Sequence, residues 1–257
     1  MSILAPRTLV RRVLPVVSLL FSMTFASQAA AAPPDASGDL ASALSRAAPA
    51  ADPKVIALAT RALQCVQKAM PARTLSVIDY SRPSTEPRLW VFDVNQRTLL
   101  FKEWVAHGRN SGDNLTERFS NAPGSLMSSL GTFVTDGTYQ GHNGYSLRLK
   151  GLDDGFNDNA ESRAIVIHGA NYVSPAFAKT QGRIGRSWGC PAVRAGVAHK
   201  LIDAIRERSV VFAYYPDKRW LSNAATLGDC GASVTASLDK GAGYARGQAG
   251  TRAALSP

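Results

Sequence analysis

Six short runs of strand-forming residues constrain the fold of this 257-residue chain more than any other feature. The runs are rich in β-branched, aromatic and other apolar residues, and clusters of Gly, Asn and Asp separate them. They cover residues 89–94, 99–106, 131–135, 146–149, 164–168 and 210–215. Residues 95–98 supply a turn, which predicts a hairpin between the first two runs. We therefore expect a mainly β (α+β) domain.

A first helix is predicted after Asp52 and Pro53, which are typical of a helix start. Apolar residues then recur at helical spacing up to Pro71, a stripe best explained as a core-facing surface. The preceding residues 33–51 are rich in Ala, Pro and Ser, and we expect them to form a linker without a fold.

A second helix is predicted over residues 191–207. Its apolar positions recur every fourth residue: Val193, Val197, Leu201 and Ile205. Pro191 suits the first helical position, because its missing N–H has no partner there. This interpretation places Cys190 directly before the helix.

Residues 1–32 have the pattern of a secretory signal peptide. Three arginines precede an apolar stretch at residues 13–26, and small residues follow to Ala32. The stretch is short for a membrane span, so we expect cleavage, a periplasmic location and no stable membrane insertion afterwards; an uncleaved anchor is the alternative.

The chain is basic, with a formal net charge of +10. Residues 1–32 contain three arginines and no acidic residue, so +7 remains after their removal. For an exported protein, an acidic polymer or anionic membrane is a more plausible partner than nucleic acid. A charge of this size can also serve solubility alone.

Three cysteines leave at least one unpaired thiol in an oxidising compartment. We hypothesise that Cys65 pairs with Cys230, which leaves Cys190 free to react. Amide groups at the predicted helix N-terminus would lower the pKa of the Cys190 thiol, and those of Gly189 and Cys190 could hold an oxyanion.

His168 ends a continuous apolar run and precedes Gly169, so it delivers a polar ring at the end of a buried strand. A cysteine nucleophile needs a neighbouring base, and histidine titrates in the right range. Each residue alone is more often structural; together they predict a Cys/His dyad. Zinc binding is the weaker alternative, because the four histidines lack the usual ligand spacing.

These residues carry a family resemblance. His168-Gly169 followed by Ser187-Trp188-Gly189-Cys190 resembles the signature of the YkuD-type L,D-transpeptidases. Trp188 stands where most members have a second His, and Ala192 where they often have Asn or Arg. The surrounding residues resemble a divergent proteobacterial branch described as a murein L,D-transpeptidase catalytic domain, over residues 88–216.

The resemblance implies an L,D-transpeptidase-like β-sandwich or barrel with a few helices, one of them starting at the nucleophile. It implies that Cys190 attacks a carbonyl of a peptidoglycan stem peptide, forms a thioester and passes the acyl group to an amine of a second stem. His168 matches the base, and the Gly169 carbonyl matches the group that orients its ring. Acyl transfer by a thiolate needs no metal or organic cofactor.

Four residues beside the nucleophile complete the expected site. Gly189 belongs to the catalytic turn, and Ser187, Trp188 and Arg186 are expected to contact substrate. The Trp188 indole would wall the pocket, and Arg186 could bind a carboxylate, although a surface role for Arg186 fits equally well.

The expected organisation is a signal peptide at 1–32, a linker at 33–51, a helix and lead-in at 52–87, a catalytic domain at 88–222 and a partly disordered tail at 223–257. Two other functions stay open. The same dyad could release the acyl group to water, as a carboxypeptidase or amidase, or the domain could bind peptidoglycan without catalysis.

Overall fold

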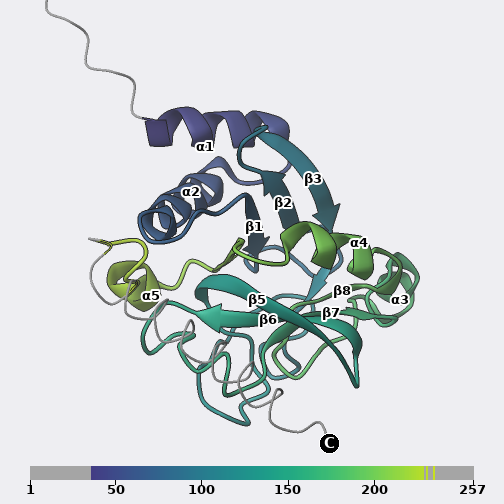
Figure 1. Cartoon of the computed structure of the whole chain (residues 1–257). Coiled ribbons are helices and arrows are strands. Elements are labelled where there is room, and N and C mark those ends of the chain that lie inside the picture. The colour runs from purple at the N-terminus through teal and green to yellow at the C-terminus, as the bar shows by residue number, and fades with distance from the viewer. Residues whose placement is uncertain (1–35, 229, 231–233, 235–257) are drawn as a thin grey trace, which may run out of the picture. The chain divides into compact units, whose positions relative to one another are not determined.

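The computed structural model describes residues 36–228, 230 and 234, all within the unit Pro34–Pro257 (Figure 1). The expected signal peptide at 1–32 and most of the expected tail lie outside the described residues. In the part that is described, no helix is long and apolar enough to cross a membrane.

The described residues form a mainly β domain, as predicted, built on one nine-stranded sheet with the order β3-β2-β1-β9-β5-β6-β7-β8-β4. The strands are β1 Thr74–Asp79, β2 Leu89–Asp93, β3 Thr98–Glu103, β4 Val105–Ala106, β5 Gly131–Gly141, β6 Gly144–Gly151, β7 Val166–Ala170, β8 Ala192–Arg194 and β9 Val210–Tyr214. The helices are α1 Ala36–Ala47, α2 Pro53–Gln67, α3 Pro175–Gln181, α4 Ala195–Ile205 and α5 Lys218–Asn223. The predicted hairpin is present as β2 and β3.

The sheet curves back on itself into a nearly closed barrel. Strands β3 and β4 lie at its opposite edges, yet only Trp104 separates them along the chain, so the two edges must meet. Arg194 of β8 joins this seam to Glu103 of β3 through two hydrogen bonds, of 2.7 and 2.6 Å. A bidentate guanidinium–carboxylate pair of this kind adds both energy and a defined geometry.

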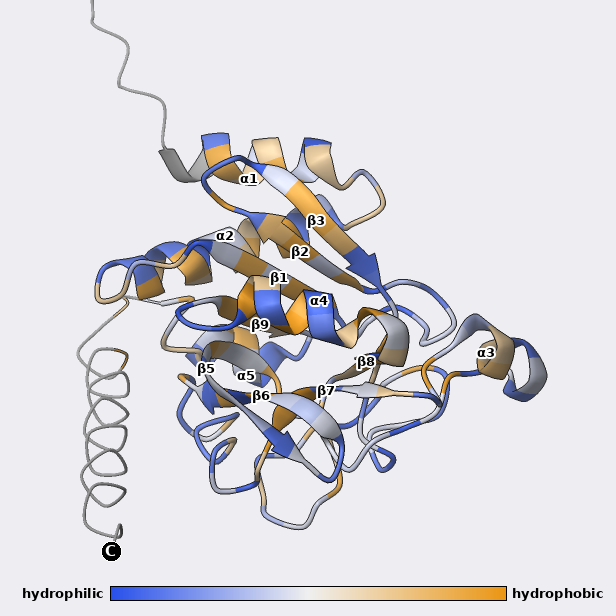
Figure 2. Cartoon of the chain, turned by 45° about the vertical axis from the view of Figure 1, so that its right-hand side comes forward, coloured by the Kyte–Doolittle hydropathy of each residue, from blue (hydrophilic) through white to orange (hydrophobic). Residues whose placement is uncertain are grey.

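The central strands are buried on both faces, because side chains alternate between two cores. In β9, Val210 and Phe212 join the core beneath α1, α2 and α5, whereas Val211 and Ala213 join the core that α4 covers. Figure 2 shows the matching hydropathy, with α1 and α4 carrying both polar and apolar residues. The apolar run at 164–167 leads into one such buried strand, β7, which begins at Val166.

Helix α1 occupies residues for which a linker was expected, so that prediction was wrong. Leu40 and Leu44 are buried in the first core, and α1 packs on α2 and β3 (Figure 1). The Ala-rich composition concealed an apolar stripe of Leu40, Ala43 and Leu44 at helical spacing. Helix α2 agrees with the prediction, and the Asp52 side chain caps it by accepting a 2.8 Å hydrogen bond from Lys54 N.

The helix expected to begin at Cys190 instead begins at Ala195. Residues Ala192–Arg194 form β8, which pairs with both β4 and β7. Pairing with distant strands outweighs the helical periodicity of these three residues. The later part of the prediction holds, since Leu201 and Ile205 are fully buried on α4.

The structure also differs from the expected domain limits. Strand β1 lies within the expected lead-in, and it pairs with β2 and in parallel with β9. Ala224, Leu227 and Val234 are buried, although a tail was expected from residue 223. The hypothesised disulfide is confirmed: Cys65 and Cys230 are bonded, with their Cα atoms 5.4 Å apart.

Candidate active site

A tight turn at residues 187–190 positions Cys190. The Ser187 hydroxyl donates to the Cys190 carbonyl at 2.6 Å and accepts from Gly189 N at 3.1 Å. Gly189 has a φ of +123°, and a Cβ there would lie 2.7 Å from the Met127 carbonyl oxygen. Only glycine fits this backbone without strain. Ser187 and Gly189 thus shape the turn.

The Cys190 sulfur lies against the start of β7. It accepts from Val166 N at 3.5 Å and donates toward the Ala164 carbonyl at 3.7 Å. The sulfur therefore occupies the Val166 N–H and the Ala164 carbonyl, two backbone groups that a neighbouring strand would otherwise bind. Cys190 is half-buried and is the one cysteine left after the disulfide forms.

The expected lowering of the thiol pKa was wrong. Burial raises the pKa of Cys190, and the Val166 N–H and the charge of Arg163 only partly oppose this effect. The physical reason is the fold around the turn: a strand follows Cys190, so no helix N-terminus faces the sulfur. The resting side chain is a neutral thiol at neutral pH.

His168 is the middle residue of β7 and is buried, so the expectation that it ends the strand was wrong. Its Nδ1 lies 3.0 Å from the Gly169 carbonyl oxygen. A carbonyl can only accept, so Nδ1 carries the proton and Nε2 is left as a proton acceptor. Burial lowers the pKa of His168, which keeps the ring neutral at pH 7. This is the geometry that the resemblance implied for Gly169.

Strand register brings Cys190 and His168 to neighbouring positions. His168 pairs with Ala192 across β7 and β8, and Cys190 lies two residues before Ala192. Continued by two residues, this parallel register places Cys190 opposite Val166, two positions before His168 on β7. The two described side chains share no hydrogen bond in this resting arrangement, because the sulfur is turned toward Val166 and Ala164. Their catalytic roles stay predictions.

Arg163 is a residue of the site that the sequence reasoning missed. Its guanidinium donates to the Ser120 and Met127 carbonyls at 2.8 and 2.7 Å and to the Ser129 hydroxyl at 2.5 Å. It thereby fixes the loop that packs against Gly189, and its charge favours the Cys190 thiolate. The sequence shows Arg163 beside the β7 run, but nothing in its spacing indicates this loop.

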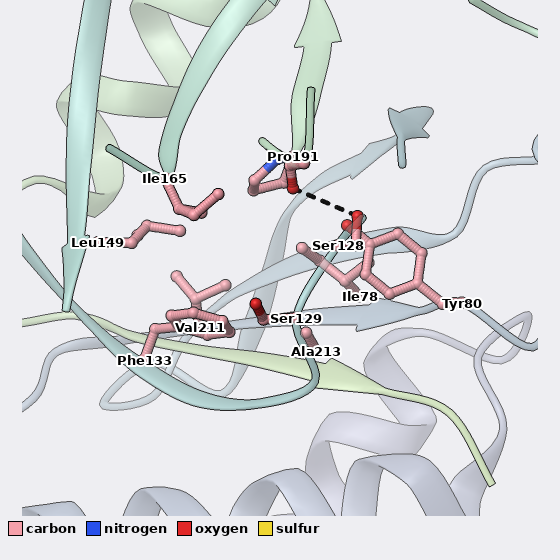
Figure 3. Close-up of a pocket in the computed structure, with 11 residues that line it drawn as sticks. Ile78, Tyr80, Ser128, Ser129, Phe133, Leu149, Ile165, Pro191, Val211 and Ala213 are labelled. Atoms are coloured by element: carbon pink, nitrogen blue, oxygen red, sulfur yellow. Dashed lines mark hydrogen bonds between the residues drawn. The ribbon is translucent and has the colours of Figure 1, made fainter. Parts of the chain in front are cut away.

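A small cavity of about 10 Å³ lies beneath the turn, with room for one water molecule. Figure 3 shows Leu149 and Ile165 on one side of it and Tyr80 and Ser128 on the other. The dashed line marks the Ser128 hydroxyl donating to the Gly189 carbonyl at 3.3 Å. The cavity lies directly beneath the turn, and it is too small to hold a peptide.

Arg186 was expected to contact substrate, but in the structure it binds other residues of the protein. It donates to the Arg109 and Gly112 carbonyls at 3.1 and 2.9 Å and pairs with Asp113 at 2.8 Å. It therefore holds the loop that precedes β5. Trp188 is 74% exposed beside the candidate nucleophile, and it does not line the small cavity beneath the turn.

The other histidines have separate surroundings. His107 is buried against Arg88, with Nδ1 2.7 Å from the guanidinium, and burial lowers its pKa to about 4. His199 stacks on Tyr145 at 4.3 Å on the surface of α4. Among the described residues, no three side chains of the types that ligate metals come together.

Comparison with known proteins gives the family. A family model described as the L,D-transpeptidase catalytic domain matches residues 47–214, which include the barrel, Cys190 and His168. The chain belongs to this family. No curated protein sequence matches it significantly.

Solved structures with similar folds are distant in sequence. An L,D-transpeptidase from Mycobacterium smegmatis has 14% identity and a TM-score of 0.35, covering 56% of this chain and 59% of that one. An L,D-transpeptidase from Mycobacterium tuberculosis H37Rv has 14% identity and a TM-score of 0.34, and the match covers 56% of this chain and 58% of that one. An L,D-transpeptidase from Stackebrandtia nassauensis has 13% identity and a TM-score of 0.34, and the match covers 71% of this chain and 92% of that one. The chain thus matches less than two thirds of the mycobacterial proteins.

Proposed function

We propose that this protein is an exported peptidoglycan L,D-transpeptidase that works through a thioester on Cys190. The observation that carries the proposal is the free Cys190 thiol beside the His168 strand, inside the residues that match the family. The disulfide supports export, because such bonds persist in oxidising compartments. Stem peptides would be both donor and acceptor.

The reaction has two balanced steps. First, the sulfur turns from β7 toward His168 and bonds to a stem carbonyl carbon while the peptide C–N bond breaks; the thiol proton passes through Nε2 to the leaving amine. Second, an acceptor amine bonds to the same carbon, the S–C bond breaks and the amine proton returns to the sulfur.

The backbone supplies one candidate oxyanion donor. The Gly189 N–H already donates to the Ser187 hydroxyl, whereas the Cys190 N–H has no acceptor among the described residues. The Cys190 amide is therefore the better candidate of the two expected from the sequence. The exposed Trp188 indole offers an apolar surface for the stem next to the nucleophile.

Covalent labelling tests the nucleophile. The purified protein is incubated with a carbapenem and its intact mass is measured; one adduct is expected on the wild type and none on Cys190→Ala. A matched variant, His168→Asn, should slow labelling strongly while leaving the fold intact. An undiminished adduct on Cys190→Ala would exclude Cys190 as the nucleophile.

Incubation with defined muropeptides tests the reaction class. Cross-linked dimers in the product mixture support transfer. Shortened stems alone would instead support the carboxypeptidase or amidase alternative, and unchanged muropeptides would support the binding module. Mass spectrometry of the exported protein tests the expected cleavage near residue 32.

A further inference from the structure

A fully buried arginine, Arg88, lies behind the turn that carries Cys190. Its guanidinium donates five hydrogen bonds of 2.7 to 3.2 Å. The acceptors are the Arg82 and Val105 carbonyls, the Thr116 hydroxyl and Nδ1 of His107. Among the described residues, no carboxylate hydrogen-bonds this guanidinium. A buried charge is costly unless all its hydrogen bonds are made, so Arg88 depends on each of these acceptors.

The contact with Arg88 fixes the state of the His107 ring. A guanidinium can only donate, so Nδ1 accepts and Nε2 carries the proton, 3.2 Å from the Gly112 carbonyl oxygen. Burial lowers the pKa of His107, and the charge of Arg88 acts in the same direction. The other charges around the ring are those of Arg183 and Arg186, which both pair with Asp113. The ring is therefore neutral at pH 7, with both nitrogens engaged.

The backbone of His107 is bonded directly to the turn. Its carbonyl accepts from Ser187 N at 2.9 Å, and the Ser187 carbonyl accepts from Arg109 N at 2.8 Å. The Ser187 hydroxyl in turn binds the Cys190 carbonyl and Gly189 N. A short chain of hydrogen bonds thus runs from the buried guanidinium to the backbone of the candidate nucleophile.

A second connection reaches the same turn through Ser128. Its hydroxyl accepts from Gly108 N at 3.0 Å and donates to the Gly189 carbonyl at 3.3 Å. Tyr80 lies beside Ser128 beneath the turn (Figure 3), and the Arg88 guanidinium lies 5.2 Å from the centroid of the Tyr80 ring. The residue after His107 and the ring next to Arg88 therefore both adjoin the hydroxyl that holds Gly189.

We propose that Arg88 and His107 are positioning residues, which hold the 187–190 turn in the geometry that acylation of Cys190 needs. The inference rests on the proposed function, because it assigns the pair a part in that reaction. Both residues act through the backbone of the turn, so their loss should slow the chemical step and leave the binding of the reagent unchanged.

Two substitutions of His107 isolate the acceptor that Arg88 needs. His107→Leu has a similar volume and offers no acceptor, whereas His107→Asn places a carboxamide oxygen near the position of Nδ1. His107→Leu should lower the maximal rate of carbapenem labelling at least about tenfold, because a buried charged donor is left unsatisfied. The carbapenem concentration for half-maximal rate should stay within about twofold, and His107→Asn should restore most of the rate. A wild-type rate in His107→Leu would overturn the inference.

Leu44→Ala is the matched control for lost stability. Leu44 is buried in the core beneath α1 and α2, a different core from the one that Cys190 packs against. The folded variant should be labelled at the wild-type maximal rate. A decrease as large as that of His107→Leu would show that lost stability alone slows labelling, and would reject the positioning role.

Amide hydrogen exchange, followed by NMR, tests the link without any reaction at Cys190. The Ser187 N–H should exchange at least about tenfold faster in His107→Leu than in the wild type, and near the wild-type rate in His107→Asn. Unchanged exchange in His107→Leu would reject the positioning role whatever the labelling shows. The expected exchange pattern in a protein that carbapenems do not label would instead reject the thioester mechanism and confirm that the pair holds the turn.

The ring nitrogens of wild-type His107 provide a test that needs no variant. Their ¹⁵N NMR shifts should show the proton on Nε2 at pH 7 and no second proton between pH 8 and pH 5, since the pKa is lowered to about 4. A proton on Nδ1 in this range is incompatible with the contact to Arg88 and would overturn the inference.

Discussion

Cys190 rests as a neutral thiol, and its local contacts explain why. Burial disfavours the thiolate, and a strand rather than a helix follows the residue. The groups that favour the thiolate are the Val166 N–H and the Arg163 guanidinium. The proposed reaction therefore requires the sulfur to leave its contacts with Val166 and Ala164 and to approach Nε2 of His168.

The pH dependence of thiol alkylation tests this account. Because burial raises the pKa of Cys190, the rate of iodoacetamide modification should keep rising with pH above the ordinary range of a cysteine thiol. Arg163→Gln removes a positive charge that favours the thiolate, so alkylation should be several-fold slower at a given pH and its midpoint should move upward. Arg118→Gln is the control, because Arg118 is exposed and is not among the groups that shift the Cys190 pKa. A midpoint below the ordinary range would contradict the resting state described above.

The backbone of the turn gives a second prediction at the residue scale. Gly189→Ala combines a positive φ with a close approach to Met127 O, so we expect about 1–3 kcal/mol of destabilisation and a loss of carbapenem labelling of at least about tenfold. Gly155→Ala is matched, since Gly155 has a φ of +75° but no atom within 4 Å of its added Cβ. It should cost similar or less stability and leave labelling intact. Equal labelling of both variants would show that the turn geometry is not needed.

At the scale of elements, α1 is an integral layer of the domain. Leu44 is fully buried between α2 and the sheet. Leu44→Ala should therefore lower the free energy of unfolding by about 3 kcal/mol in urea titrations. Leu100→Ala on β3, where the side chain is 41% exposed, should change it by less than about 0.5 kcal/mol. A negligible effect of Leu44→Ala would restore the linker interpretation of residues 33–51.

At the scale of the whole molecule, the Cys65–Cys230 bond ties α2 to the segment after α5 across 165 residues of sequence. Closing so long a loop restricts the unfolded chain strongly. The double variant Cys65→Ser/Cys230→Ser should be about 2–5 kcal/mol less stable, measured by thermal unfolding under oxidising conditions. With reductant the wild type should approach the variant, whereas Cys190→Ser should match the wild type throughout. An unchanged melting temperature in the double variant would refute this role.

Local pattern was enough to predict several parts of the molecule. The run at 89–94 contains the buried strand β2, and Asp52 caps α2, because these signals depend only on nearby residues. The run at 164–168 only overlaps β7, which begins at Val166 and continues past His168 to Ala170. The odd number of cysteines indicated at least one free thiol, and the hypothesis that this thiol is Cys190 is confirmed by the Cys65–Cys230 bond. The motif around His168 and Cys190 identified the family, because its residues are close in sequence.

The remaining features depend on partners far along the chain. Strand β1 contains polar as well as apolar residues, and it is stabilised by pairing with β9. Its partners in β9 lie about 135 residues later in the sequence. Residues 192–194 have helical periodicity but form β8, because β4 and β7 supply hydrogen bonds on both sides. Arg163 acts on the site by binding a loop that is distant in sequence, through hydrogen bonds to Met127 and Ser129.

The amino-acid sequence by itself determined the mainly β character, the presence of an unpaired cysteine and the family, since periodicity, cysteine count and a short motif are local or countable properties. Tertiary structure alone decided the charge state of Cys190, the position of Arg163 and the small cavity beneath the turn. A pKa depends on burial and on nearby charges, and a pocket depends on which distant groups come together. Neither property can be read from the order of residues in the sequence.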